Sequence, residues 1–312
     1  MNIQEELIKK IEENDSIIIC GHLNPDGDSI SSSFGLRNFL RLKYPNKKIN
    51  STSTSPKYIK PLVEDSDVID EEIISKSLII IVDVSDLDRV EDQRLITNPN
   101  IICFDHHILS KENNILTLRD TSFISCSLLL TDFLLNNYHD IDSKTANYFY
   151  IGMTTDSGRF QFDSTSKTFT LASKLVSCGA QPKKIYSQLY KQSSEELRWK
   201  SYVYSHFNFD GDITYLTFSL KDNEQLHFDK EIVSGSVNLL SSIDDHHIWA
   251  MFLQQDDGLI RVELRSSNRN VQEVALKFNG GGHLLASGCK LDSFDKVKLV
   301  LEELNKASTI NE

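Results

Sequence analysis

An acid- and histidine-rich turn, CGHLNPDGDSI at residues 20–30, follows directly after the apolar run SIIIC. It places His22, Asp26 and Asp28 close together in the chain. Crowded carboxylates repel one another and raise one another's pKa unless a positive charge lies among them. The turn therefore predicts a bound cation.

Three further groups of acids and imidazoles stand at or near the ends of apolar segments. They are Asp83 after LIIIV, the run Asp105, His106 and His107 after IICF, and Asp156 in GMTTDSGRF. In open α/β sheets, ligands bind outside the carboxyl ends of the strands, so groups on neighbouring strands would converge on one crevice. Mixed histidine and aspartate ligands without thiolates suit Mn²⁺ or Mg²⁺. Two such ions, about 3.5–4 Å apart, commonly hydrolyse phosphate esters by clamping phosphoryl oxygens and lowering the pKa of bound water.

A calcium loop is the first alternative for the turn, since Asn24, Asp26 and Asp28 copy its first three ligand positions. That loop needs glycine at its sixth position and glutamate at its twelfth. Here those positions hold Ser29 and Gly35, which excludes it. Each acid alone would fit an ordinary turn or cap, but their order along the chain favours a shared metal site.

The triplet Asp-His-His occurs twice. The first copy, residues 105–107, follows an apolar run, whereas the second, residues 245–247, precedes the run IWAMFL. Only the first would emerge from the carboxyl end of a strand. We interpret the second as a polar helix-to-strand connection without a metal.

The second half of the chain contains FNGGGHLLASGC, with three consecutive glycines at 280–282. Glycines let backbone N–H groups approach an anion closely, as in phosphate-binding loops. His283 adds a donor, and Arg265 in LRSSNR can grip a phosphate with two hydrogen bonds. A plain turn is the alternative. The segment is not a P-loop, because no Gly-Lys-Ser/Thr follows it.

The composition is that of a globular protein, with 39% hydrophobic and 25% charged residues among 312. A net charge of −12 excludes the broad basic surface that long nucleic acids require. Five scattered cysteines indicate reduced thiols. No apolar stretch is long enough to cross a bilayer, and the N-terminus is typical of an amphipathic helix rather than a signal peptide. We therefore expect a cytoplasmic protein with no membrane partner.

Apolar runs at 16–20, 78–82 and 101–104 alternate with helical patterns, which predicts a parallel, doubly wound sheet. Helices are expected within 125–138, 143–156 and 164–179. After a polar helical stretch the pattern alternates more, with a hairpin turn at 256–258. We expect an α/β catalytic domain over 1–190, a helical connector over 191–210 and a smaller α/β domain over 211–312.

The ordered motifs HLNPDGD, VDVSD, DHH and TTDSGRF, followed by NGGGHLLASG, resemble the DHH/DHHA1 phosphoesterase family. The resemblance covers essentially the whole chain. It is strongest to the stand-alone nanoRNase A-type oligoribonucleases, some of which also remove the 3′-phosphate of 3′-phosphoadenosine 5′-phosphate.

The resemblance implies two divalent ions, Mn²⁺ or alternatively Mg²⁺, with Asp83 bridging them. The ligands of the first ion would be His22, Asp26 and Asp83, and those of the second Asp28, Asp83, His106 and Asp156. His107 would face the scissile phosphate, and Asp105 would support the motif.

Arg159 matches the family's arginine near the substrate. In the DHHA1 domain, the positions that hold the far end of the substrate are matched by Arg265, Ser266, Gly281, Gly282 and His283. The substrate would lie in a cleft between the two domains.

The function implied is two-metal hydrolysis of short oligoribonucleotides, such as the dinucleotide pApA, to mononucleotides. Conversion of 3′-phosphoadenosine 5′-phosphate to AMP is a further expected activity, and a homodimer is common among relatives. Two alternatives stay open at this point. One is a phosphodiesterase for cyclic dinucleotides such as cyclic-di-AMP, and the other is a non-catalytic nucleotide sensor.

Overall fold

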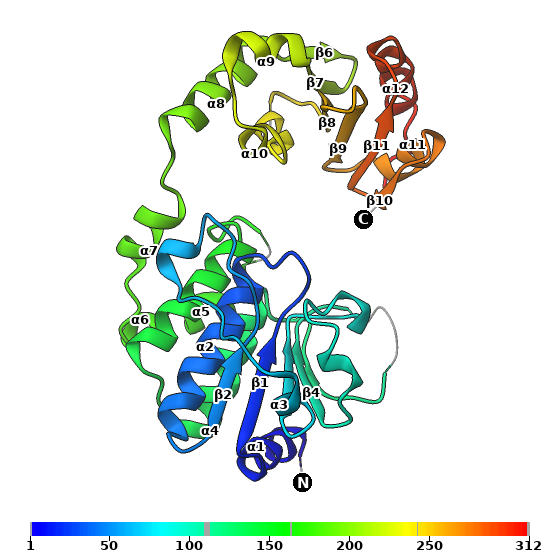
Figure 1. The fold of residues 1–312 in the computed structure, drawn as a ribbon. Helices are drawn as coiled ribbons and strands as arrows, with labels where there is room; N and C mark the ends of the chain where they lie inside the picture. Colours follow the sequence, from blue (N-terminus) through cyan, green and yellow to red (C-terminus); the bar gives the residue numbers. More distant parts are fainter. Residues whose placement is uncertain (1, 109–112, 163, 242, 311–312) are drawn as a thin grey trace. The chain divides into compact units, whose positions relative to one another are not determined.

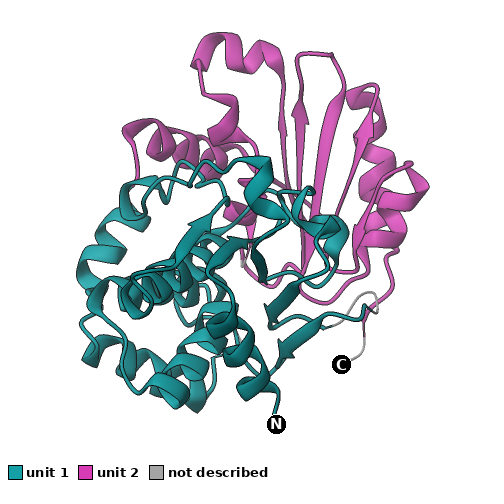
Figure 2. Ribbon diagram, turned by 60° about the horizontal axis from the view of Figure 1, so that its bottom comes forward, with its two compact units in different colours: residues 1–191 teal, residues 192–312 magenta. Residues whose placement is uncertain are grey.

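A computed structural model describes residues 2–108, 113–162, 164–241 and 243–310 (Figure 1). The chain divides into two units, Met1–Lys191 and Gln192–Glu312, which Figure 2 colours teal and magenta. Helix α8, Ser194–His206, lies in the stretch expected to be a connector. Its Trp199 and Val203 are buried with Leu216 and Phe218, so this helix packs within the second unit.

The first unit contains a sheet of five parallel strands in the order β2-β1-β3-β4-β5. The three apolar runs form its central strands. Alternate residues of β1 face two different cores, because Ile17 and Ile19 pack in one cluster and Ile18 and Cys20 in another. The short edge strands β2 and β5 are more polar and lack an apolar run that would predict them. The bounds are β1 Ser16–Cys20, β2 Lys48–Ser51, β3 Leu78–Val82, β4 Ile101–Asp105 and β5 Leu116–Arg119.

One face of this sheet is covered by long helices, among which α2, α4 and α5 pack against one another (Figure 1). The opposite face is covered by the short helix α3 and by residues 84–96. The segment between β3 and β4 contains only two short 3₁₀ helices, so the two faces are covered less evenly than the alternating pattern predicts. The helices expected within 125–138, 143–156 and 164–179 are confirmed. The bounds are α1 Ile3–Glu13, α2 Gly27–Lys43, α3 Glu71–Ile74, α4 Cys126–Tyr138, α5 Ser143–Asp156, α6 Ser166–Ser177 and α7 Pro182–Leu189.

The second unit contains a six-stranded mixed sheet in the order β10-β11-β9-β8-β7-β6. Only β7 and β8 pair in parallel. The predicted hairpin is confirmed, since β8 and β9 are antiparallel and Gly258 takes a φ of +80° between them. Both units are therefore α/β, as the sequence predicts. The bounds are β6 Asn208–Asp210, β7 Ile213–Phe218, β8 Ile248–Gln254, β9 Ile260–Ser266, β10 Gly281–His283, β11 Ala286–Leu291, α9 Leu220–Leu226, α10 Lys230–Val233, α11 Val271–Lys277 and α12 Val297–Leu304. Within the described ranges, no helix combines the length and apolar character that crossing a bilayer requires.

Candidate active site

The carboxyl ends of three neighbouring strands carry acids and histidines. His22 follows β1, Asp83 follows β3, and Asp105 ends β4. Strand β1 lies between β2 and β3, which makes its boundary with β3 a topological switch point, the place where open α/β sheets bind ligands. Asp83 takes a left-handed backbone conformation, with φ of +61°, directly after its strand. Such strain in a non-glycine residue is concentrated at functional sites.

The first group of candidate metal ligands is His22, Asp26 and Asp83. Nε2 of His22 lies 3.6 Å from Oδ2 of Asp26 and 3.6 Å from Oδ2 of Asp83. Nδ1 of the same ring lies 3.0 Å from the carbonyl oxygen of Leu23, so a proton there is hydrogen-bonded and Nε2 offers its lone pair. Asp26 caps α2, and its Oδ1 accepts two backbone N–H groups while Oδ2 faces His22.

The second group is Asp28, His106 and Asp156, and a third is Asp83, His106 and His107; within each, the candidate ligand atoms all lie within 4.8 Å of one another. Nε2 of His106 lies 3.5 Å from Oδ2 of Asp156 and 3.3 Å from Oδ1 of Asp83. Its Nδ1 lies 3.1 Å from the carbonyl oxygen of Phe123, which again directs Nε2 toward the acids. Asp83 therefore lies against a histidine of each group.

Two buried atoms at the centre of this cluster have no hydrogen-bond partner in the described part of the chain. They are Oδ1 of Asp83 and Nε2 of His106, which lie 3.3 Å apart as an ion pair without hydrogen-bond geometry. Leaving a buried polar atom unpaired costs about 1–3 kcal/mol, and more when the group is charged. A divalent cation accepts lone pairs from both atoms, so the residues fit a metal.

Burial and the negative charges of neighbouring aspartates raise the pKa of both Asp28 and Asp156. The raised pKa values reflect repulsion between the assembled acids. A bound cation would lower these pKa values again, because it favours the ionised carboxylates. Asp28 is also fixed by backbone contacts, because its oxygens accept the N–H groups of Cys126 at 2.6 Å and Ser127 at 3.0 Å. Its charge thereby lies at the N-terminus of α4, which a negative charge stabilises.

Sequence reasoning missed Gly152, which permits this arrangement. A Cβ atom there would lie 2.0 Å from Oγ of Ser127 and 2.5 Å from Oδ1 of Asp28. Glycine in a helix interior otherwise destabilises the helix by about 1 kcal/mol relative to alanine. A glycine in the interior of α5 was the signal in the sequence that could have identified this position. The close approach of Ser127 and Asp28 explains why glycine is needed there.

His107 is held by a chain of ion pairs. Its Nδ1 lies 2.8 Å from Oδ1 of Asp105, and Nε of Arg119 donates to Oδ2 of the same carboxylate at 3.0 Å. Burial opposes ionisation of Asp105, but the hydrogen bonds from His107 and the charge of Arg119 prevail and lower its pKa. The His107 side chain is 46% exposed, so its ring is oriented yet accessible. Arg119 ends a short edge strand without any motif, and sequence reasoning missed it.

Tyr58 is a second residue that sequence reasoning missed. Partial burial and the negative charges of Asp26 and Asp156 raise the pKa of Tyr58 to about 12. The shift shows that the negative charges of these two acids act on the Tyr58 hydroxyl. Arg159 is exposed in the loop after α5 and belongs to none of the groups of candidate ligands.

The residues expected to bind substrate in the second unit lie on adjacent strands. His283 pairs with Ala286, and Ala286 pairs with Arg265, which places Arg265 and His283 in one row across three strands. Side chains in one row face the same side of a sheet. Ser266 is buried, and its hydroxyl oxygen accepts two backbone N–H groups of the following turn.

The glycines at 281 and 282 differ in how much room their surroundings leave for a side chain. Gly282 takes a φ of +138°, and a Cβ there would lie 2.6 Å from the carbonyl oxygen of Ala286. A Cβ at Gly281 would meet nothing within 4 Å. The fold of this unit therefore requires glycine at 282, whereas the space above Gly281 is open.

Both histidines of the second Asp-His-His triplet contact other residues of the second unit. Nδ1 of His247 lies 3.0 Å from Oδ1 of Asp212, and His246 stacks on Phe209 with ring centroids 4.4 Å apart. A 3₁₀ helix, Val237–Leu240, precedes the triplet, and β8 follows it.

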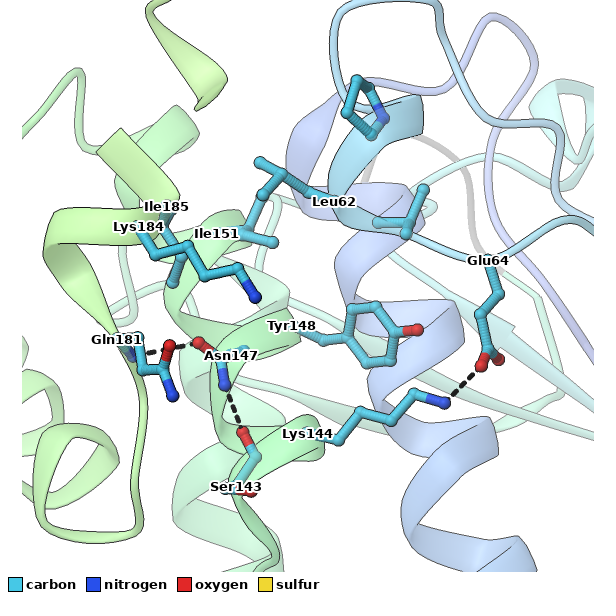
Figure 3. Close-up of a pocket in the computed structure, with 12 residues that line it drawn as sticks. Leu62, Glu64, Ser143, Lys144, Asn147, Tyr148, Ile151, Gln181, Lys184 and Ile185 are labelled. Atoms are coloured by element: carbon cyan, nitrogen blue, oxygen red, sulfur yellow. Dashed lines mark hydrogen bonds and ion pairs between the residues drawn. The ribbon is translucent and has the colours of Figure 1, made fainter. Parts of the chain in front are cut away.

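Two cavities of the first unit differ in their chemistry. The larger, of about 370 Å³, lies between α5, α7 and the turn Lys60–Leu62 (Figure 3). Tyr148 and Ile151 line it, and the ion pair between Glu64 and Lys144 lies at one side. None of its lining residues belongs to the candidate metal groups. The smaller cavity, of about 120 Å³, is the one lined by the candidate ligands His22, Asp26 and Asp83 and by His107.

A parallel sheet whose switch point gathers aspartates and histidines is the arrangement expected of a metal-binding α/β enzyme. Comparison with known families identifies it further. Residues 16–153 match the model of the DHH family N-terminal domain, and residues 212–309 match that of the DHHA1 domain. The chain therefore belongs to the DHH family of phosphoesterases, which confirms the resemblance.

The chain is similar to two proteins named bifunctional oligoribonuclease and PAP phosphatase NrnA. The protein of Mycoplasma genitalium is 30% identical, and the match covers 98% of each chain. The protein of Bacillus subtilis is 30% identical over 97% of each chain. A solved structure from Bacteroides fragilis, described as an exopolyphosphatase-related protein, superposes with a TM-score of 0.86. It is 26% identical, and the match covers 97% of this chain and 95% of that one.

Proposed function

We propose that this chain is a two-metal phosphodiesterase that hydrolyses short oligoribonucleotides, including dinucleotides such as pApA, to mononucleotides. We also propose that it converts 3′-phosphoadenosine 5′-phosphate to AMP. The observation that carries the proposal is the position of buried Asp83 between His22 and His106, each from a different candidate ligand group. The names of the two NrnA relatives support the choice of substrate.

The proposed ligands of one ion are His22, Asp26 and Asp83, and those of the other are Asp28, Asp83, His106 and Asp156. Bound there, Mn²⁺ or alternatively Mg²⁺ supplies activation of water and neutralisation of charge on the phosphoryl group. The pairing of His107 with Asp105 through Nδ1 leaves Nε2 to face a phosphoryl oxygen. Asp105 and Arg119 position that ring and do not contact the substrate.

The second unit is proposed to hold the far end of the substrate through Arg265, Ser266, Gly281, Gly282 and His283. Two features support this role. Arg265 and His283 face the same side of the sheet, and the open space above Gly281 leaves its backbone accessible to a phosphate. A remote contact of this kind fixes the reacting phosphate in place, which converts binding energy into rate.

The net charge of −12 favours short substrates over long nucleic acids. The five cysteines are free thiols, which supports our proposal that the protein acts in the reducing cytoplasm. A homodimer is the proposed assembly. A cyclic-dinucleotide phosphodiesterase is less favoured, because the relatives are named for oligoribonucleotides and PAP. A non-catalytic sensor would not need the complete set of ligands.

Metal dependence tests the proposal directly. Protein stripped of metal should lose at least nine-tenths of its hydrolysis of pApA, and added Mn²⁺ should restore it, because the acids need a cation to act together. The measurement is product formation from pApA, cyclic-di-AMP and 3′-phosphoadenosine 5′-phosphate. Full activity in excess chelator, with no retained metal by elemental analysis, would refute the two-metal mechanism. Preference for cyclic-di-AMP would instead favour the alternative substrate.

The second prediction follows from the proposed roles of the two units, catalysis in the first and binding of the far end of the substrate in the second. His283→Ala should reduce kcat/KM for pApA by about ten- to a hundred-fold, since a contact to a charged group is worth about 1.5–3 kcal/mol. Hydrolysis of bis-p-nitrophenyl phosphate should change less than about three-fold, because this small ester lacks the remote nucleotide. Both substrates are measured at saturating Mn²⁺. Equal losses of kcat/KM on the two substrates would mean that the glycine-rich loop belongs to the catalytic centre or is needed for folding.

A further inference from the structure

The loop that follows Asp156 has an uncommon backbone. Gly158, Arg159 and Phe160 take φ values of +52°, +64° and +66° in succession. Left-handed conformations are strained for residues other than glycine and persist only where surrounding contacts enforce them. Here the N–H of Arg159 donates to the carbonyl oxygen of Thr154 at 3.0 Å, and that of Phe160 donates to Oγ of buried Ser157 at 3.0 Å. The fold thus holds Arg159 in a defined place.

The Arg159 side chain rests on an aromatic ring. Its Cζ atom lies 4.7 Å from the ring centroid of Tyr190, the residue at the C-terminal end of α7. Tyr190 contacts Tyr186 with ring centroids 5.7 Å apart, and Tyr186 contacts buried Tyr150 at 6.5 Å. This series of rings connects Tyr190 to the core. Arg159 forms no ion pair with any carboxylate of the described residues.

Stacking leaves the hydrogen-bonding edge of a guanidinium free. The five N–H donors of arginine lie in the plane of the group, so a face packed on a ring does not consume them. Arginine otherwise loses much rotamer freedom when it binds a ligand, and prior ordering reduces that loss. Arg159 is exposed, lies three residues beyond Asp156 and has no carboxylate partner among the described residues, so it is available to bind an anion.

We propose that Tyr190 is a positioning residue that holds Arg159 ready for a phosphate group of the short oligoribonucleotide. This inference rests on the proposed function and extends it to a residue outside the metal groups and the glycine-rich loop. Tyr190 acts through Arg159 and makes no contact with the reacting atoms.

A double-mutant cycle tests this coupling. Arg159→Gln should lower kcat/KM for pApA by about ten- to a hundred-fold. Tyr190→Leu should lower it by about three- to ten-fold, the range expected when a cation–π interaction is removed. In the Arg159→Gln background, Tyr190→Leu should have little further effect, since its partner is already absent. Tyr190→Phe keeps the ring and should recover most of the activity lost in Tyr190→Leu.

Losses that multiply in the double variant would overturn the inference, as would a Tyr190→Phe variant as impaired as Tyr190→Leu. Tyr204→Leu is the matched control, because Tyr204 is an exposed tyrosine of α8 and should tolerate the change. Circular dichroism establishes that each variant is folded. If the unmodified chain fails to hydrolyse pApA with Mn²⁺, the proposed function falls together with this inference. Metal-dependent hydrolysis with independent losses refutes the coupling alone.

Discussion

Asp83→Ala should abolish turnover of every substrate, including the generic ester bis-p-nitrophenyl phosphate. Oxygens of Asp83 lie 3.6 Å from Nε2 of His22 and 3.3 Å from Nε2 of His106, so one substitution removes a proposed ligand of both ions. Loss of an outer partner of a metal ligand already costs about 10–100-fold. We therefore expect a loss of more than about 10³-fold in kcat for pApA and for the ester, measured at saturating Mn²⁺.

Asp86→Ala provides the control for this substitution. Asp86 lies three residues beyond Asp83, where it caps a 3₁₀ turn by accepting the N–H of Asp88 at 3.0 Å, and it belongs to no candidate metal group. Its replacement should leave kcat within a few-fold. Retention of more than a tenth of the ester hydrolysis by folded Asp83→Ala would contradict a shared ligand.

The duplicated triplet allows a second comparison within one chain. Replacing His106 and His107 together by alanine should reduce turnover of pApA by more than about 10³-fold. Nδ1 of His106 is hydrogen-bonded to the carbonyl oxygen of Phe123, its Nε2 faces Asp83, and Asp105 orients His107, so both rings are fixed at the candidate site. The measurement is kcat for pApA, with metal content determined for each variant.

Replacing His246 and His247 by alanine should leave kcat within a few-fold. These substitutions remove the half-exposed ion pair of His247 with Asp212 and the stacking of His246 on Phe209. Removal of an exposed ion pair costs at most about 1 kcal/mol of stability, which does not alter the chemistry. Equal losses of turnover from the two pairs of substitutions would place the chemistry elsewhere.

The sequence alone determined which residues could belong to the metal site, because that information is local. An unbroken apolar run predicts a strand covered on both faces, and an acid or histidine at its end must lie at the edge of the sheet. This reasoning found His22, Asp83 and His106. It also separated the two Asp-His-His triplets, since one follows a strand and the other precedes one. The parallel sheet and the change of pattern after the polar helical stretch were visible for the same reason.

Only the tertiary structure decided which strand ends are neighbours. Hydrophobic periodicity fixes the class of each element and is silent on strand order, so the switch point between β1 and β3 could not be derived from it. Arg119, Gly152 and Tyr190 were missed because their contacts are with residues of other elements. Such contacts leave no local pattern in the sequence. Tertiary packing alone brings such pairs together, because the free energy that selects them comes from burial and ion pairing across elements.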